Sequence, residues 1–132
     1  MCNLAAIQLA AGEAEAALET IEGAEATYLE AMPEPGEMAG WRSSIRADAL
    51  AGVGRVEEAL ALAEKSVEST RAHRQNWSLP LCLRALARAR AAAGEGDVDE
   101  ALDEAIAVAT ATGCLSQVTS MEEERESLAA AG

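Results

Sequence analysis

Apolar and small residues recur every three or four positions along most of this chain, and this spacing predicts helices. We expect helices over about residues 2–11, 13–31, 37–52 and 55–74, a fifth from a cap at Asn76 or Ser78 to about Ala93, a sixth from Asp97 to a stop at Gly113, and a seventh over 115–130. Two prolines and a glycine between residues 32 and 36 break the helical pattern, because proline cannot continue an α-helix. The pattern therefore predicts seven helices.

A glycine returns every 42 residues and opens the same phrase each time. Gly12, Gly54 and Gly96 each begin the pattern Gly-x-(Ala/Val)-(Glu/Asp)-x-Ala-Leu, and a small residue stands seven positions earlier, as Ala5, Ala47 and Ala89. Self-similarity at a fixed period indicates a chain of stacked supersecondary units, each unable to bury its apolar face alone. We expect one domain over 1–132, with units at about 1–35, 36–77 and 78–113 and a capping helix at about 114–130.

The composition favours an all-α fold without strands. Half of the residues are apolar, yet there is no Phe, and the aromatic residues are Tyr28, Trp41 and Trp77. Alanine is the strongest helix former and lets helices approach closely, whereas the β-branched and aromatic residues that favour sheets are few.

The formal net charge of −13 is unevenly distributed. Residues 1–41 carry eight acidic and no basic side chains, residues 42–90 carry nine basic against five acidic, and residues 91–132 carry ten acidic against Arg125 alone. An acidic chain repels phosphate, so we expect no nucleic-acid partner. Three widely spaced cysteines without a C-x-x-C pair indicate neither a disulfide framework nor a zinc site and favour a reducing cytoplasm. Since no apolar stretch is long enough to cross a bilayer, we expect no membrane partner.

A small residue in the first helix, glycine at the turn and alanine in the second helix resemble a tetratricopeptide repeat. In the middle unit the resemblance is carried by Ala47, Gly54, Val56, Ala59 and Leu60, and their counterparts stand 42 positions away on either side. It implies a right-handed α-solenoid of about three helix-turn-helix units plus the capping helix. The family period is 34 residues, so these helices are longer, as in the Ala-rich C-terminal arrays of bacterial LuxR/MalT-type and adenylate-cyclase-like regulators. The alternative family for this repeat period is a HEAT or armadillo array.

The resemblance also implies a concave groove lined by the first helix of each unit. Counting back from the glycine turns gives the candidate groove residues Trp41, Ser44, Asp48, Leu81, Arg84 and Arg88. Arg84 and Arg88 stand four apart on one helix face. Two interpretations remain open. In one, the basic residues Arg84, Arg88 and Arg90, with Arg42 and Arg46 on the neighbouring first helix, form ion pairs inside the stack with Asp48, Glu57, Glu58 and Glu64. In the other, they form a patch for an anionic ligand such as an acidic peptide, flanked by Trp41 and Trp77.

The sequence carries no motif for catalysis. It lacks the zinc-protease, nucleophile-elbow and phosphate-loop patterns, and its single histidine, His73, stands at a helix end, where a cation suits the helix dipole. We therefore expect no enzyme activity, no cofactor and no metal.

The first helix is apolar nearly all round and exposes Leu4, Ile7 and Leu9 in this interpretation. Such a stripe must be covered by something, either by a second copy of the chain or by preceding sequence. Two hypotheses follow. The chain is a protein-binding module of a larger bacterial regulator, with a peptide or partner domain in the groove, or it is a self-association module that forms a homodimer through this helix.

Overall fold

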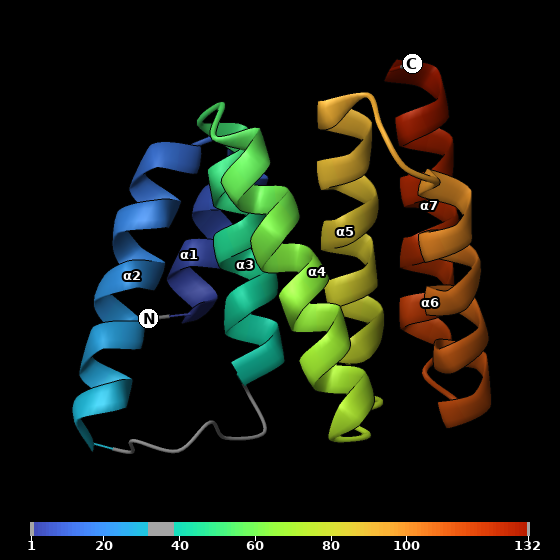
Figure 1. Cartoon of the computed structure of the whole chain (residues 1–132), viewed down its shortest axis with the longest axis horizontal. Helices are drawn as coiled ribbons and strands as arrows, with labels where there is room; N and C mark the ends of the chain where they lie inside the picture. The colour runs from blue at the N-terminus through green and yellow to red at the C-terminus, as the bar shows by residue number, and fades with distance from the viewer. Residues whose placement is uncertain (1, 32–38, 132) are drawn as a thin grey trace.

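The structure is a computed structural model that describes residues 2–31 and 39–131. These residues form seven helices and no strand (Figure 1). The helices are α1 (Cys2–Ala10), α2 (Ala14–Ala31), α3 (Ala39–Gly52), α4 (Val56–Ala72), α5 (Leu79–Ala93), α6 (Val98–Thr112) and α7 (Leu115–Ala131). The all-α prediction is confirmed, and the helix limits agree with those expected to within a few residues. The expected break at 32–36, the first residues of the third helix and the first unit boundary lie outside the described residues.

The repeated glycines lie in the turn after the first helix of each hairpin, in a backbone conformation that other residues rarely adopt. Gly12, Gly54 and Gly96 have φ angles of +82°, +88° and +81°. At Gly12 and Gly54 an added Cβ would meet nothing within 4 Å, so the conformation rather than the space requires glycine there. The turns at Gly12 and Gly54 share one geometry, in which the glycine N–H donates to the carbonyl three residues earlier. After α5 this position is held by Gly94, with a φ of +68°, and Gly96 follows two residues later.

The caps of α5 and α6 differ in chemistry. Asp97 caps α6 as expected, because its carboxylate accepts a hydrogen bond from the Glu100 backbone N–H at 2.9 Å. Ser78 stands at the cap position of α5 but makes no side-chain cap. Its hydroxyl instead donates to the Gln75 carbonyl at 3.3 Å, since a serine side chain can also reach a carbonyl three residues back. Pro80 lies in the first turn of α5, where no helical hydrogen bond needs its nitrogen.

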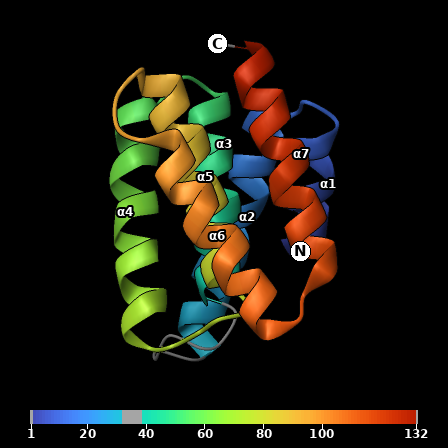
Figure 2. The same ribbon diagram turned by 90° about the vertical axis from the view of Figure 1, so that its right-hand side faces the viewer.

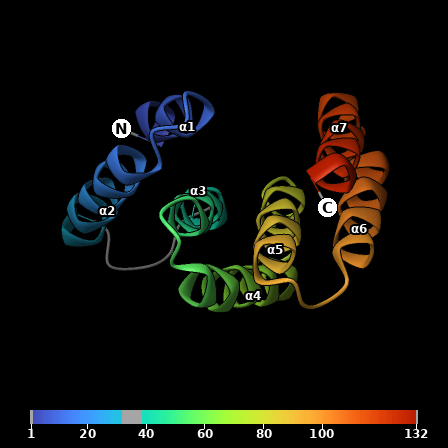
Figure 3. The same ribbon diagram turned by 90° about the horizontal axis from the view of Figure 1, so that it is seen from above.

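The helices form two layers along an arc (Figure 3). In the inner layer α1 contacts α3, α3 contacts α5 and α5 contacts α7, whereas in the described part of the chain the backbones of α2, α4 and α6 do not approach one another. The end view shows α1 and α7 on one side of the stack and α4 on the opposite side, with α7 beside α6 (Figure 2). A helical repeat solenoid has this architecture, with a concave face lined by the inner helices.

Alanine allows the close packing of the two layers. The repeat-related alanines are all buried, with 2% or less of their surface exposed: Ala5, Ala17, Ala47, Ala59, Ala89 and Ala101. One apolar cluster joins α1, α2 and α3 and includes Ala59 of α4 and Ala89 of α5, and another joins α4, α5, α6 and α7 and includes Ala47 of α3. Leu60 and Leu62 of α4 pack against both clusters, so the core is continuous along the stack.

Candidate functional site

The expected groove residues meet at a pocket of about 530 Å³ on the concave face. Trp41, Ser44 and Asp48 line it from α3, and Arg84 and Arg88 line it from α5. They share one side of their helices because they stand three and four residues apart. The sixth candidate, Leu81, is not among the lining residues and packs, partly buried, against the core.

The remaining walls of the pocket are apolar and come mainly from α1 and α3. Ala6, Leu9 and Ala10 of α1 line it, together with small or apolar residues of α2, α3 and the first turn: Gly12, Ala14, Ile45, Ala51 and Gly52. Leu9 also packs against the core, so it does not lie with Leu4 and Ile7 in one exposed stripe as expected. Leu4 is 49% and Ile7 65% exposed. Leu4 and Ile7 stand three residues apart and point outward. Because a helix has 3.6 residues per turn, Leu9 lies on roughly the opposite side of α1.

One arginine in the pocket is held by two carboxylates from different helices. Arg88 donates from Nη1 to Asp48 Oδ2 at 2.7 Å, from Nε to Glu124 Oε1 at 2.5 Å and from Nη2 to Glu124 Oε2 at 2.9 Å. Asp48 belongs to α3 and Glu124 to α7, and their side chains are only 12% and 16% exposed. Arg88 therefore joins three inner helices.

The neighbouring arginine has a neutral partner. Arg84 donates from Nη1 to the Ser120 hydroxyl of α7 at 3.2 Å. Among the described residues its Nε, like Oδ1 of Asp48, is buried without a hydrogen-bond partner. Buried polar atoms are rarely left in this state, because each costs free energy when it is removed from water.

The pKa values of the four charged groups reflect this environment. Burial raises the pKa of Asp48 although Arg88 opposes it, and the hydrogen bond from Arg88 lowers the pKa of Glu124. Burial and the charge of Arg88 lower the pKa of Arg84. At Arg88 burial acts to lower the pKa, but the bonds to Glu124 and Asp48 outweigh it and raise the pKa. The cluster thus holds two guanidinium groups and two carboxylates whose charges balance.

The ion-pair interpretation of the arginines applies to some of the expected partners. Asp48 pairs with Arg88, while Glu58 pairs with Arg55 on its own helix. The described residues form no ion pair with Glu57 or Glu64, whose side chains are exposed on α4.

Trp41 of the pocket wall is in contact with Trp77. Their ring centroids lie 6.4 Å apart with the planes at 71°, an edge-to-face contact. Trp77 is 49% exposed, and its carbonyl accepts a hydrogen bond from Gln117 of α7 at 3.1 Å. Trp41 lies at the pocket wall, so an apolar surface adjoins the charged cluster.

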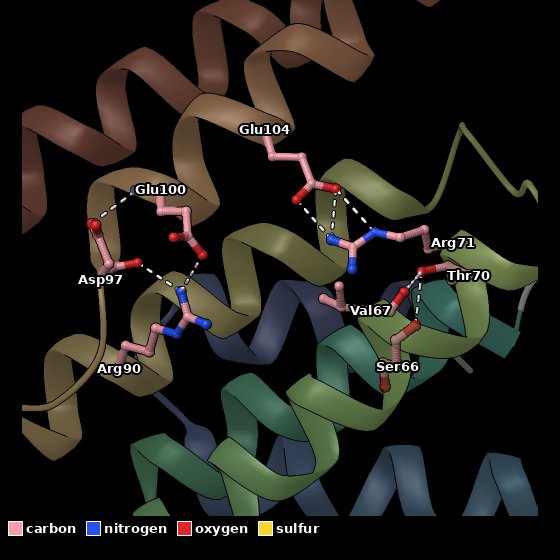
Figure 4. Close-up of polar contacts among 8 residues, drawn as sticks. All are labelled: Ser66, Val67, Thr70, Arg71, Arg90, Asp97, Glu100 and Glu104. Carbon is pink, nitrogen blue, oxygen red and sulfur yellow. Dashed lines mark hydrogen bonds and ion pairs between the residues drawn. The ribbon is translucent and has the colours of Figure 1, made fainter.

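Arg71 and Arg90 lie on the outer side of the stack and serve other contacts (Figure 4). Arg71 of α4 makes a bidentate ion pair with Glu104 of α6, in which Nη2 of Arg71 lies 2.7 Å from Oε1 of Glu104. Arg90 donates to the Asp97 carbonyl at 2.7 Å and lies 3.8 Å from Glu100. The Arg71–Glu104 pair connects α4 with α6, and Arg90 connects α5 with the start of α6.

The matching family supports what the fold and the pocket indicate. The tetratricopeptide-repeat family model matches residues 1–22 and 41–65, and each stretch covers a first helix, its glycine turn and the start of the second helix. The chain is a tetratricopeptide-repeat-like helical array. No curated protein and no solved structure matches the chain.

Tetratricopeptide repeats generally mediate protein–protein contacts and are typically non-catalytic. In this array His73 lies at the end of α4, with Nδ1 2.8 Å from the Ser69 carbonyl. Burial raises the pKa of the Cys82 thiol to about 11, which keeps it protonated at neutral pH. Within residues 2–31 and 39–131 no group of three or more His, Cys, Asp or Glu could hold a metal ion. None of the described helices is long and apolar enough to span a membrane.

The residues of α1 and α7 that surround the charged cluster had no chemical signal in the sequence. Ala6 and Ala10 are indistinguishable from the other alanines of the array, and Glu124 stands in a run of four glutamates over residues 122–126. The sequence separations of the contacting residues, however, are regular. Arg84–Ser120 and Arg88–Glu124 are both separated by 36 residues, as expected for two successive turns of α5 facing two successive turns of α7.

Proposed function

We propose that this array binds a segment of another protein in the concave pocket between α1, α3 and α5. The observation that carries the proposal is the pocket itself, which combines an apolar wall on α1, a half-buried tryptophan and polar groups of α3 and α5. Binding sites typically have this mixture of apolar surface and a few converging polar groups. The general role of tetratricopeptide repeats in protein–protein contacts supports the same proposal.

The proposal includes the division of the array. Three units, at about 1–35, 36–77 and 78–113, would each contribute one inner helix, and the helix at about 114–130 would cap the last unit. We also propose that the array belongs to a larger bacterial regulator in the cytoplasm. This assignment to a larger regulator is supported by the 42-residue period and the alanine-rich units, which resemble the arrays of such regulators.

The test is selection of binding peptides with a matched pair of variants. Random twelve-residue peptides displayed on phage are selected against the immobilised chain, and the selected peptides are then titrated with two variants. Ala10→Lys introduces a long charged side chain at the pocket wall, and Ala107→Lys makes the same change at an exposed position of α6. We expect Ala10→Lys to weaken binding at least about tenfold and Ala107→Lys to leave it unchanged. Selected peptides that bind both variants equally well would contradict the pocket as the site.

A second candidate function is self-association through α1. It is favoured by one observation, the exposure of the neighbouring apolar side chains Leu4 and Ile7 on one face of the helix. A second copy of the chain would cover this face in a two-fold contact. The dimer and the pocket use different sides of α1, so each can be tested alone.

A further inference from the structure

The charge balance of the pocket determines which ligands it can favour. Arg84 and Arg88 are the cations that an acidic peptide would use, but Asp48 and Glu124 stand beside them. A ligand carboxylate that approached Arg84 would meet Asp48 in the pocket wall, and Glu124, which lies outside the lining, already pairs with Arg88. It would gain little from a cluster without net charge. The remaining walls, from α1, α2 and α3, contain no charged residue.

The unsatisfied hydrogen-bonding atoms point to a different chemistry. Arg84 Nε is a donor without an acceptor, and Asp48 Oδ1 is an acceptor without a donor. Both residues line the same pocket. An amide group offers what both atoms lack, a carbonyl oxygen that accepts and an N–H that donates. A ligand that satisfies two buried atoms of this kind gains more than one that pairs with exposed atoms, because the protein already bears the cost of burying them.

We infer that the pocket takes an uncharged protein segment that presents an amide group, from its main chain or from an Asn or Gln side chain, to Arg84 and Asp48. This inference rests on the proposed function and specifies its ligand. The carbonyl of the segment accepts from Arg84 Nε, and its N–H donates to Asp48 Oδ1, once the two protein side chains rotate toward it. Small apolar side chains of the segment contact the alanines of α1, and Trp41 borders them.

The experiment uses two small probes on the full chain, followed by heteronuclear NMR. N-methylacetamide represents a peptide amide, and sodium acetate represents an acidic side chain, both titrated at constant ionic strength. The reporter is the Arg84 Nε–H signal, assigned by its loss in Arg84→Lys. We expect N-methylacetamide to move this signal in a saturable way and acetate to bind at least about fivefold more weakly.

Two variants separate charge from hydrogen bonding. Asp48→Asn and Glu124→Gln each remove one negative charge from the cluster, but only the first changes the proposed acceptor. We expect both to strengthen acetate binding about fivefold. Only Asp48→Asn should weaken the response to N-methylacetamide, while Glu124→Gln keeps it. If Asp48→Asn does not fold, Glu124→Gln and the wild type still test the charge balance.

The outcomes distinguish this inference from the proposed function. Stronger binding of acetate than of N-methylacetamide to the wild type would overturn the neutral ligand. An unmoved Arg84 signal with both probes would overturn the amide site. An equal response of Asp48→Asn and the wild type to N-methylacetamide would overturn the role of Asp48. None of these results alters the comparison of Ala10→Lys with Ala107→Lys, which tests whether the pocket binds protein segments at all.

Discussion

Gly40 and Cys82 stand one repeat period of 42 residues apart and touch each other: the Cys82 thiol donates a hydrogen bond to the Gly40 carbonyl at 3.3 Å. They lie near the starts of α3 and α5, so the contact joins successive inner helices. The sequence period is therefore also a packing relationship. Gly40 allows this approach because it has no side chain. Thr70 near the end of α4 and Ser78 at the start of α5 leave no room for one.

Gly40→Ala should destabilise the array by about 1–3 kcal/mol through overpacking. A Cβ at residue 40 would lie 2.6 Å from Thr70 Cγ2 and 2.8 Å from Ser78 Oγ, and both of these side chains are buried. The control is Gly23→Ala in α2, where an added Cβ meets nothing within 4 Å. Because glycine is a poor helix former, that change should stabilise by about 0.5–1 kcal/mol. Urea unfolding followed by circular dichroism measures both, and equal effects of the two substitutions would contradict this packing.

Ala59→Leu should cost about 1–3 kcal/mol of unfolding free energy, since Ala59 is fully buried between the two layers and has no room for three more carbons. Ala61→Leu adds the same atoms at an exposed position of the same helix and should change stability by less than about 0.5 kcal/mol. An unchanged unfolding midpoint for Ala59→Leu would show that the repeated alanine does not lie at the closest packing of the layers.

Arg88→Met should destabilise the array by about 2 kcal/mol or more at pH 7, because it leaves Asp48 and Glu124 largely buried without their cation. The exposed Arg55–Glu58 pair provides the control, and Arg55→Met should leave the unfolding midpoint nearly unchanged.

The destabilisation by Arg88→Met should also depend on pH. Arg88 lowers the pKa of Glu124 in the folded protein, so the stability from this pair is fully present above the ordinary value of 4.5 and is lost as the pH falls through the native pKa. The difference between wild type and variant should therefore be largest at neutral pH and shrink in acid. Unfolding curves at several pH values measure it, and a difference that grows in acid would contradict the ion-pair account.

Ile7→Lys should abolish dimer formation if the array associates through α1, because it places a charge on the exposed apolar face. Leu115→Lys makes a similar change at an exposed residue of α7 and should leave association unchanged. Analytical ultracentrifugation at micromolar concentrations gives the masses. A monomeric wild type whose α1 is helical in solution would refute the dimer.

The sequence predicted the helices well because glycine, proline and capping residues act locally. The positive φ angles of Gly12, Gly54 and Gly96 and the cap at Asp97 depend on the residues next to them. Ser78 was the exception, since two local hydrogen bonds compete at that position and the sequence does not decide between them.

The candidate site was predictable only on the helices that carry polar residues. Helical spacing assigned Trp41, Asp48 and Arg88 to one face, and these residues do line the pocket. The second carboxylate of the cluster, Glu124, was missed because its contact depends on how α7 follows α5 along the arc. Local rules give the faces of each helix but not the relative shift of two helices that are distant in the sequence.

The most direct measurement for the central proposal is the location of a bound peptide on the array. A peptide selected on the wild type is made with a photoreactive group at its centre, cross-linked to the full chain, and the labelled residues are identified by mass spectrometry. We expect labels on the inner faces of α1, α3 and α5, at Ala6, Ala10 and Trp41, and loss of labelling in Ala10→Lys but not in Ala107→Lys. Labels confined to α2, α4 and α6, or to Leu4 and Ile7, would contradict the concave pocket as the binding site.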